Sequence, residues 1–340
     1  MQTYTGRSFI FACVLLASGV CSASKEDSVS PETLITQARK LHEIWTAGTP
    51  PVTMRAEIQV FNGKGGVTPG QYTVNWVSPA KWREDLRFPN YERVRVHDAK
   101  GYWQKSGLDF QPKIIRELDT FLNSESVLKI RAKQFLGKVK SHDKDGVRER
   151  CTEVKSKTAT DWILCFDERN GNLVSLEYPK NDNESPPEIS RIEYSAFHEL
   201  GEKHVPFEIR AFRDKTIVAT VKVAEIKPFA EENPSAFVVP ANSEFWAQCE
   251  GMQEAELVGR VQPMYPESAR SNHQSGGVMF YAVVEADGTV SHLTVIEHAA
   301  PSLEVASADA IRQWRYRPAA CNSTPIRVET GISVYFSLRQ

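Results

Sequence analysis

Between residues 53 and 226 the sequence is a succession of short runs rich in β-branched and aromatic residues, each bounded by turn residues. In several runs apolar and polar residues alternate: Tyr72, Val74 and Trp76 are expected to face one way, and Thr73 and Asn75 the other. Strands with one buried and one wetter face are typical of antiparallel sheets. The predicted strands are residues 53–61, 71–76, 82–88, 93–98, 101–106, 137–141, 148–155, 161–167, 173–178, 189–194, 205–213 and 216–226.

Two helices are predicted in this region. Ser30 can cap the first, because proline and glutamate follow it at the first helical positions. Its apolar residues recur at helical spacing, and the second helix is expected over residues 112–136. The apolar positions of the first helix are Leu34, Ala38, Leu41 and Trp45.

The N-terminus has the layout of a secretory signal peptide. Arg7 precedes an apolar run over residues 9–17, and small residues follow up to Ala23. We therefore expect residues 1–23 to be removed and the mature protein to be exported. A retained, membrane-anchored form and a lipoprotein modified at Cys21 are the alternatives, although the apolar run is short for a membrane span.

Four cysteines remain after removal of the signal peptide, and an even number in an exported chain favours disulfides. Cys151 and Cys165 lie in two short predicted strands around a turn at residues 157–160, so antiparallel pairing would place them face to face. Cys249 and Cys321 are then left to each other. A zinc site is the rival interpretation, but the sequence has no CxxC and no histidine at ligand spacing from a cysteine pair, so no metal is expected.

Charge and motifs exclude several classes of function. Lys and Arg total 41 against 43 Asp and Glu, a net charge of −2, which gives no electrostatic reason to expect nucleic acid as a partner. Metal-protease, serine-hydrolase, P-loop and dinucleotide-binding motifs are absent from the sequence. The chain is therefore not expected to be an enzyme or to carry a cofactor.

The last part of the sequence carries four elements in a specific order. The motif QPMYP occupies residues 262–266, and a strand from Gly277 leads to a hairpin turn at Asp287-Gly288. Ser302 can cap a helix that contains Val305, and the motif WRYRP at residues 314–318 precedes one long strand over residues 326–338. This combination resembles the C-terminal domain of the TonB energy-transducer family, which implies a ββαβ fold over residues 256–340.

The resemblance also implies a periplasmic location and a partner. An extended segment of an outer-membrane TonB-dependent receptor would pair with the edge of the final strand, in energy-dependent transport. A proline at Val328 or Thr330, whichever directs its N–H outward, would block such pairing. Pairing with a second copy, giving a homodimer, is the alternative use of this edge. The expected partner-binding residues are Gln262, Pro263, Tyr265, Pro266, Ile326, Val328, Thr330 and Ile332.

The N-terminal region is similar to periplasmic lipoprotein carriers of the LolA type, in its helix-then-strands order and its WVSPAKWR corner at residues 76–83. Such half-open barrels shelter acyl chains, which implies an alternative function as a carrier of a lipid or other apolar ligand; a structural spacer is the simpler interpretation. The predicted class is α+β. We expect a signal peptide (1–23), a curved antiparallel β-rich domain with helices (24–240) and a TonB-like domain (241–340).

Overall fold

The structure, a computed structural model, describes residues 29–122, 127–129, 134–156, 161–179, 189–229, 234–249 and 251–338. The predicted signal peptide at 1–23 and the predicted turn at 157–160 lie outside the described residues. Within the described ranges, no helix combines the length and the apolar character needed to cross a membrane.

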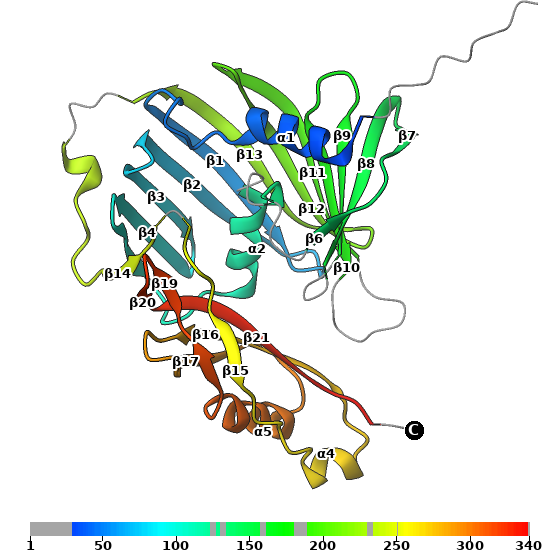
Figure 1. Cartoon of the computed structure of the whole chain (residues 1–340), viewed down its shortest axis with the longest axis vertical. Helices are drawn as coiled ribbons and strands as arrows, with labels where there is room; N and C mark the ends of the chain where they lie inside the picture. The colour runs from blue at the N-terminus through cyan, green and yellow to red at the C-terminus, as the bar shows by residue number, and fades with distance from the viewer. Residues whose placement is uncertain are drawn as a thin grey trace, which may run out of the picture.

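The N-terminal part is one curved antiparallel sheet of 14 strands, called here the N-terminal sheet (Figure 1). The first long strand of this sheet pairs with the last long strand, with Val60 opposite Ala219. The two halves of the region therefore meet in the middle of the sheet. In sheet order the strands are β14 (Glu244–Ala247), β5 (Gly101–Ser106), β4 (Tyr91–Asp98), β3 (Lys81–Phe88), β2 (Val67–Ser78), β1 (Val52–Phe61), β13 (Thr216–Pro228), β12 (Lys203–Arg213), β11 (Ile189–Leu200), β10 (Leu173–Pro179), β9 (Trp162–Asp167), β8 (Val147–Ser156) and β6 (Gln134–Leu136), with β7 (Lys140–Lys144) also paired to β8.

The predicted alternation is confirmed in this sheet. Tyr72, Val74 and Trp76 of β2 are buried, whereas Thr73 and Asn75 between them are partly exposed. The buried side chains belong to one large core that also includes residues of both helices. A sheet this wide curves, and its hollow side is where the helices lie (Figure 1).

Helix α1 (Pro31–His42) begins as predicted, with the Ser30 hydroxyl accepting a hydrogen bond from the Thr33 backbone N–H at 3.2 Å. Helix α2 covers Lys113–Leu122, and the helix predicted over 112–136 does not reach its predicted end, because residues 134–136 form β6 and pair with β8. The apolar spacing that predicted a longer helix included Phe135. In β6 the side chain of Phe135 is 51% exposed, so it does not belong to a buried helix face.

Residues 251–338 form the second part, called here the C-terminal module. A three-stranded sheet in the order β17–β16–β21 carries helix α5 on one face, which confirms the expected ββαβ order (Figure 1). The elements are β15 (Glu256–Gly259), α4 (Glu267–Ser271), β16 (Gly276–Val284), β17 (Val290–Glu297), α5 (Pro301–Ile311), β18 (Arg315–Arg317), β19 (Ala319–Cys321), β20 (Thr324–Ile326) and β21 (Val328–Phe336), with β15 paired to β18 and β19 to β20; a short 3-10 helix, η1 (Pro234–Phe237), precedes the module.

The predicted hairpin turn at Asp287-Gly288 is confirmed and has a second role. Gly288 has φ of 82°, a backbone conformation that favours glycine. Its carbonyl accepts a hydrogen bond from the Tyr316 N–H at 2.9 Å, and a Cβ at this position would lie 2.0 Å from the Tyr316 carbonyl oxygen. The turn is therefore locked against β18 by close backbone contact.

Helix α5 differs from its prediction at its first turn. Pro301 is the first helical residue and Ala300 takes the capping position, so Ser302 lies inside the helix and is not the cap. Val305 is 62% exposed, because the buried face starts from Leu303 and continues through Ser307 and Ala310. The predicted helix is thus present, but its predicted cap lies inside it and Val305 is on its exposed side.

Two further boundaries differ from the predictions. Ile326 does not belong to the final strand: a tight turn at Asn322 and Ser323, both with positive φ, folds residues 324–326 back onto β19. Strand β14, predicted to lie within the domain 241–340, pairs with β5 as the edge of the N-terminal sheet. The N-terminal sheet therefore extends beyond residue 240.

Candidate functional site

Strand β21 is an edge strand of the C-terminal module. Its partner is β16, in an unbroken antiparallel register from Val328 opposite Val284 to Phe336 opposite Gly276. Among the described residues, no strand pairs with the other edge. That edge presents backbone N–H and C=O groups to which a further strand can be added.

The structure places three predicted binding residues together on β21. Val328, Thr330 and Ile332 are two positions apart, so their side chains share one face of the sheet, the face on which Ile332 is buried against the α5 side. Ile326, by contrast, is buried in the β19–β20 hairpin.

The register also corrects the expectation that either Val328 or Thr330 directs its N–H outward. In an unbroken antiparallel ladder, residues two apart direct their N–H groups to the same side. The N–H groups of Val328 and Thr330 therefore both point toward β16 or both point outward. A test needs two positions that are an odd number of residues apart, so that one of the two N–H groups points outward.

The QPMYP motif lies in a segment without regular secondary structure, next to the end of β21. The Tyr265 ring packs edge-on against Phe336 with 5.3 Å between ring centroids, and its hydroxyl donates to the Gln274 carbonyl. Gln262 is exposed, while Pro263 and Pro266 are partly buried. The motif and the final strand therefore form one continuous surface.

Two features of this surface were missed from the sequence. Met264, inside the motif, is 83% exposed, although methionine is usually buried. The Trp314 indole N–H donates to the Val261 carbonyl at 2.8 Å and so fixes the start of the motif. The sequence carried no signal for either feature, since both depend on how the segment crosses the module.

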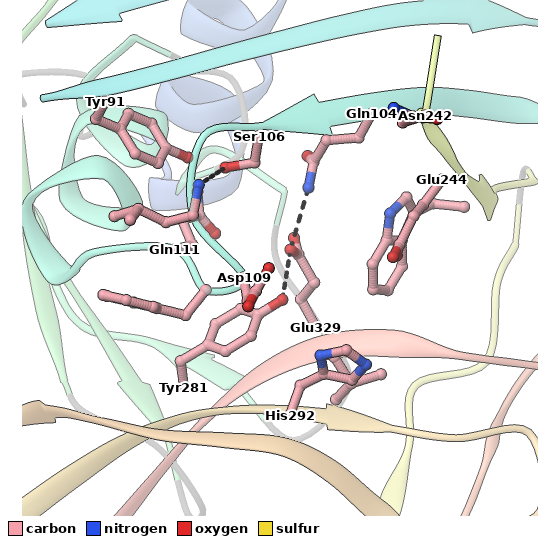
Figure 2. Close-up of a pocket in the computed structure, with 14 residues that line it drawn as sticks. Tyr91, Gln104, Ser106, Asp109, Gln111, Asn242, Glu244, Tyr281, His292 and Glu329 are labelled. Atoms are coloured by element: carbon pink, nitrogen blue, oxygen red, sulfur yellow. Dashed lines mark hydrogen bonds between the residues drawn. The ribbon is translucent and has the colours of Figure 1, made fainter.

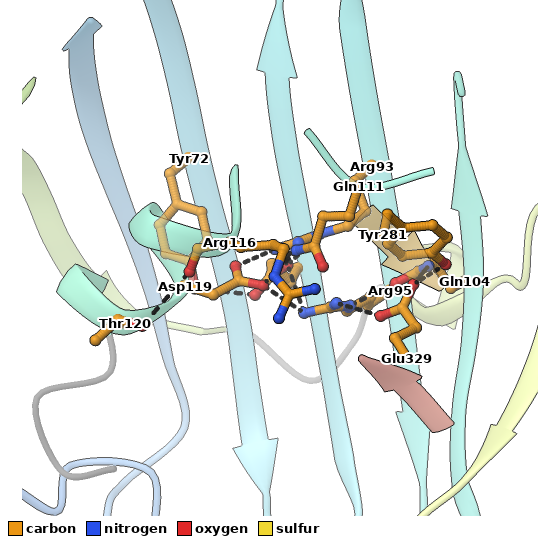
Figure 3. A network of polar contacts seen from close by, with 11 residues as sticks. Tyr72, Arg93, Arg95, Gln104, Gln111, Arg116, Asp119, Thr120, Tyr281 and Glu329 are labelled. Atoms are coloured by element: carbon orange, nitrogen blue, oxygen red, sulfur yellow. Dashed lines mark hydrogen bonds and ion pairs between the residues drawn. The ribbon is translucent and has the colours of Figure 1, made fainter. Parts of the chain in front are cut away.

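The other face of β21 is covered by the N-terminal sheet along its first half. The Glu329 carboxylate accepts hydrogen bonds from the Tyr281 hydroxyl at 2.9 Å and from Gln104 at 3.4 Å, and it lies 3.8 Å from Arg95 (Figure 3). Burial, and then the charge of Glu329, raises the pKa of Tyr281, so its hydroxyl stays a donor. Glu329 thus fastens β21 to the N-terminal sheet.

Behind Glu329 lies a buried network of charges between α2 and the sheet (Figure 3). Arg93 has no exposed side-chain surface and pairs with Glu84 at 2.7 Å and with Asp119 at 2.6 Å. Arg95 lies 3.5 Å from the Asp119 carboxylate and links this group to Glu329. Burial alone would raise the pKa of Asp119, but the two arginines hold it below its usual range.

Further contacts seat the C-terminal module on the N-terminal part. Trp246 of β14 packs with Tyr281 and Val283 of β16, and the Arg327 guanidinium lies 4.3 Å from the centre of the Trp246 ring. Lys113 at the start of α2 pairs with Glu297 at the end of β17. The module is therefore held by contacts from β16, from the end of β17 and from the start of β21.

Beyond this contact the same face of the module forms a groove of about 590 Å³. Its walls include Gly277 and Met279 of β16 and Ser333 and Tyr335 of β21. Ser333 is exposed, and Tyr335 is 40% exposed. The second half of β21 is therefore the part that is accessible from this side.

The hollow side of the N-terminal sheet is largely filled by its own helices. An apolar cavity of about 30 Å³ remains, with Trp45, Leu122 and Ile209 among its lining residues. A space of this size holds only a few water molecules. An acyl chain would fit only after residues of the helical layer had moved.

Both predicted disulfides are confirmed. Cys151 and Cys165 are direct partners in the β8–β9 ladder, as the predicted strands required, and Cys249 is bonded to Cys321. The fold also brings His142 of β7 to 3.6 Å from the Cys151 sulfur, a proximity that the sequence spacing did not indicate. Because both sulfurs are in the disulfide, they are not available as thiolate ligands.

Comparison with known families supports the C-terminal resemblance. Residues 261–338 match the family model described as Gram-negative bacterial TonB protein C-terminal. A search of curated protein sequences found no significant match. The match lies over the part of the chain that contains the QPMYP motif, α5 and β21.

The solved structures that are similar to this chain are distant from it in sequence. A LolA superfamily protein from Nitrosomonas europaea is 9% identical, with 62% of this chain and 98% of that one covered and a TM-score of 0.40. A putative outer membrane lipoprotein-sorting protein domain from Vibrio parahaemolyticus is 10% identical, covering 58% and 94%, with a TM-score of 0.39. A DUF1329 family protein from Desulfovibrio piger is 8% identical, covering 62% and 100%, with a TM-score of 0.42.

Proposed function

We propose that this chain is a periplasmic TonB-like interaction protein whose C-terminal module binds extended segments of outer-membrane TonB-dependent receptors. The single observation that carries the proposal is the outer edge of β21, which has no partner strand among the described residues. The family match over residues 261–338 supports the choice of partner. The role is binding rather than catalysis.

The second half of β21 is the part of the edge that suits an added strand best. Residues 332–336 lie beyond the contact with the N-terminal sheet, next to the groove and to Tyr265. An added strand would gain main-chain hydrogen bonds there, and Gln262 and Met264 would contact the residues that follow it. We therefore place the partner along the outer edge of residues 330–336, with most of its contacts at 332–336, and across the QPMYP motif.

Proline substitutions at positions of opposite parity test this placement. Thr330→Pro and Ser333→Pro each delete one N–H, and neither replaces a fully buried side chain. One N–H points toward β16 and the other outward, since the positions are three apart. We expect the outward variant to melt like the parent and to lose binding of peptides copied from receptor N-terminal segments. A folded outward variant that binds these peptides like the parent would refute strand addition.

Gln262→Ala should have a smaller effect. The side chain is exposed and stands beside the proposed path of the partner, so its loss is expected to weaken binding by about 0.5–1.5 kcal/mol, the contribution of one hydrogen bond. Analytical ultracentrifugation of the same variants tests the homodimer alternative. If the edge pairs with a second copy, the outward proline changes the mass of the particle, not only its affinity for peptide.

The carrier alternative is a second proposal, and the apolar lining of the cavity between the helices and the hollow of the sheet favours it. Opening this space would require the helical layer to move, as noted above. Native mass spectrometry of protein purified without detergent separates the two functions. A co-purifying lipid supports the carrier, and an empty chain that binds receptor peptides supports the interaction module.

The export step is a separate proposal. Cleavage after Ala23 would give a mature chain starting at Ser24. N-terminal sequencing of the protein from the cell envelope should find this start, and an intact Met1 in the membrane fraction would instead indicate a retained anchor.

A further inference from the structure

Four side chains with metal-binding atoms gather on one face of the N-terminal sheet, on the neighbouring strands β7, β8 and β9 (Figure 1). Glu149 and Cys151 are two positions apart on β8. His142 of β7 lies directly opposite Glu149, and Cys165 of β9 lies directly opposite Cys151. Residues two apart on a strand share a face, and so do direct cross-strand partners. The register therefore brings two sulfurs, an imidazole and a carboxylate together.

The distances within this cluster are those of a zinc site. All four donor atoms lie within 4.8 Å of one another. The His142 Nε2 lies 3.2 Å from the Glu149 Oε2 and 3.9 Å from the Cys151 sulfur. Bonds of about 2.0–2.3 Å to a tetrahedral zinc ion place its donor atoms about 3.3–3.8 Å apart. Only the two sulfurs are closer together, and cleavage of the bond between them lets them separate.

The Glu149 carboxylate is a buried oxygen donor that is available to a cation. Its side chain is 7% exposed, and its Oε2 makes no hydrogen bond with any described residue, although it points at the His142 ring. Buried carboxylates are usually paired, hydrogen-bonded or bound to a metal. The His142 side chain is 49% exposed, so an ion can reach the cluster from solvent.

The redox state of the two cysteines decides whether the cluster can bind a metal, because the thiolate is the ligand. A dithiol reductant supplies two electrons and two protons, becomes a disulfide itself, and leaves Cys151 and Cys165 as thiols. The β8–β9 ladder, which runs from Glu149 opposite Asp167 to Val154 opposite Trp162, holds the two thiols opposite each other. A zinc ion then displaces the two thiol protons and binds both thiolates.

We propose that Cys151 and Cys165 belong to a redox-controlled zinc site, which the reduced protein completes with His142 and Glu149. Two thiolates, one imidazole and one carboxylate suit Zn²⁺, and a site with four protein ligands is structural rather than catalytic. The disulfide and the zinc site are two states of one pair of cysteines. The disulfide joins β8 to β9, whereas zinc also fixes β7 through His142.

Zinc titration of the oxidised and the reduced full chain tests the proposal. The chain is reduced with a phosphine, which takes its oxygen from water, is freed from it without air, and is titrated against a coloured chelator. We expect the reduced chain to bind one Zn²⁺ at least about a hundredfold more tightly than the oxidised chain, which offers no thiolate. Equal affinities in the two states would overturn the proposal, and they are the result expected from a plain ion pair between His142 and Glu149.

Hydrogen exchange of the same samples gives a second readout. Zinc should slow exchange in β7 of the reduced chain, because this strand pairs only with β8 among the described residues. The exchange of β16, in the C-terminal module, should not change, and its protection shows that the reduced chain is folded. Bound zinc without slower exchange in β7 would show that His142 is not a ligand.

Paired variants locate the ion on one of the two cysteine pairs. Cys151→Ser with Cys165→Ser should abolish the tight binding of the reduced chain, whereas Cys249→Ser with Cys321→Ser should leave it unchanged. Tight binding that is lost only in the second double variant would refute the site.

A single substitution on an exposed side chain tests the cluster without removing a disulfide. His142→Gln should weaken zinc binding by the reduced chain at least about tenfold, and His273→Gln, also exposed, is the matched control and should not. Unchanged affinity in His142→Gln would exclude this cluster as the zinc site.

Discussion

The two parts of the chain are both antiparallel sheets with helices on one face, but they complete their cores differently. The N-terminal sheet has 14 strands, curves around α1 and α2, and buries a charged network together with its apolar core. The C-terminal module has only three strands in its main sheet and covers one face with α5. Its other face is covered for half its length by the N-terminal part. The small sheet is thus held against the N-terminal sheet, while the outer edge of β21 stays unpaired among the described residues.

The largest difference between the parts should come from the buried network. Arg93→Met leaves Glu84 and Asp119 without their main partner, and breaking a buried ion pair in this way costs about 3–5 kcal/mol. Arg55→Met removes an exposed pair with Glu225 and should cost less than about 1 kcal/mol. Urea unfolding measures both. Similar costs for the two variants would mean that the network is not part of the stable core.

The two disulfides should differ in what their loss affects. Cys151–Cys165 lies within the N-terminal sheet and closes 14 residues, whereas Cys249–Cys321 joins the end of β14 to the module and closes 72. Loop-closure entropy gives about 3 and about 4 kcal/mol. Replacing the second pair by serines should separate the melting of the module from that of the sheet in calorimetry. A single shared transition would contradict this assignment.

Acid should destabilise the N-terminal part selectively. His42 accepts from the Leu173 N–H at 2.9 Å, and burial lowers its pKa from 6.5 to about 4. Below pH 6.5 the unfolded chain therefore binds more protons than the folded chain. The contribution of neutral His42 to the free energy of unfolding is complete above pH 6.5 and is lost as the pH falls to about 4. The loss amounts to about 3 kcal/mol.

Hydrogen exchange of the intact chain checks the acid response, because it reports on both parts at once. Exchange in α1 and β10 should accelerate between these pH values, and His42→Gln should remove the dependence. The histidines of the module, His273, His292 and His298, are exposed, so its protection should change less. Equal acceleration in both parts would contradict the role of His42.

The smallest change in stability should come from the contact that Glu329 makes between β21 and the N-terminal sheet. Glu329→Gln keeps the contacts with Tyr281 and Gln104 and removes the charge that faces Arg95, at a cost of about 1–2 kcal/mol. Exchange should rise in the first half of β21 and not in residues 332–336. Glu267→Gln, on exposed α4, is the matched control and should change neither half.

Local patterns predicted most of the strands because a period of two reports which face is buried. The Cys151–Cys165 pair followed from the register of β8 and β9, and the ordered motifs predicted the elements of the module. The end of α2 could not be predicted, since residues 134–136 have their backbone hydrogen bonds satisfied by β8, a strand that lies later in the chain.

The charged contact between the module and the N-terminal sheet was not predicted, for a similar reason. Arg93 and Arg95 alternate with apolar residues and read as the solvated face of a strand. Sequence periodicity does not distinguish a charged face that meets water from one that meets Glu84 and Asp119. Likewise, nothing in the sequence around Asp109 or Trp246 indicated that they line one cavity, because that cavity lies between the two parts and both supply its walls (Figure 2).

The Cys249–Cys321 disulfide has a mechanical consequence. Tension applied at Phe336, the end of β21, reaches Cys321 through 15 residues of chain (336 − 321) and crosses the disulfide to the segment that follows β14, so most of the module lies outside the loaded path. The 72-residue separation between the two cysteines corresponds to about 250 Å of extended chain. While the disulfide is intact, a pulling force cannot extend the chain between the two cysteines. Single-molecule extension between β1 and the C-terminus should show this length released only after reduction.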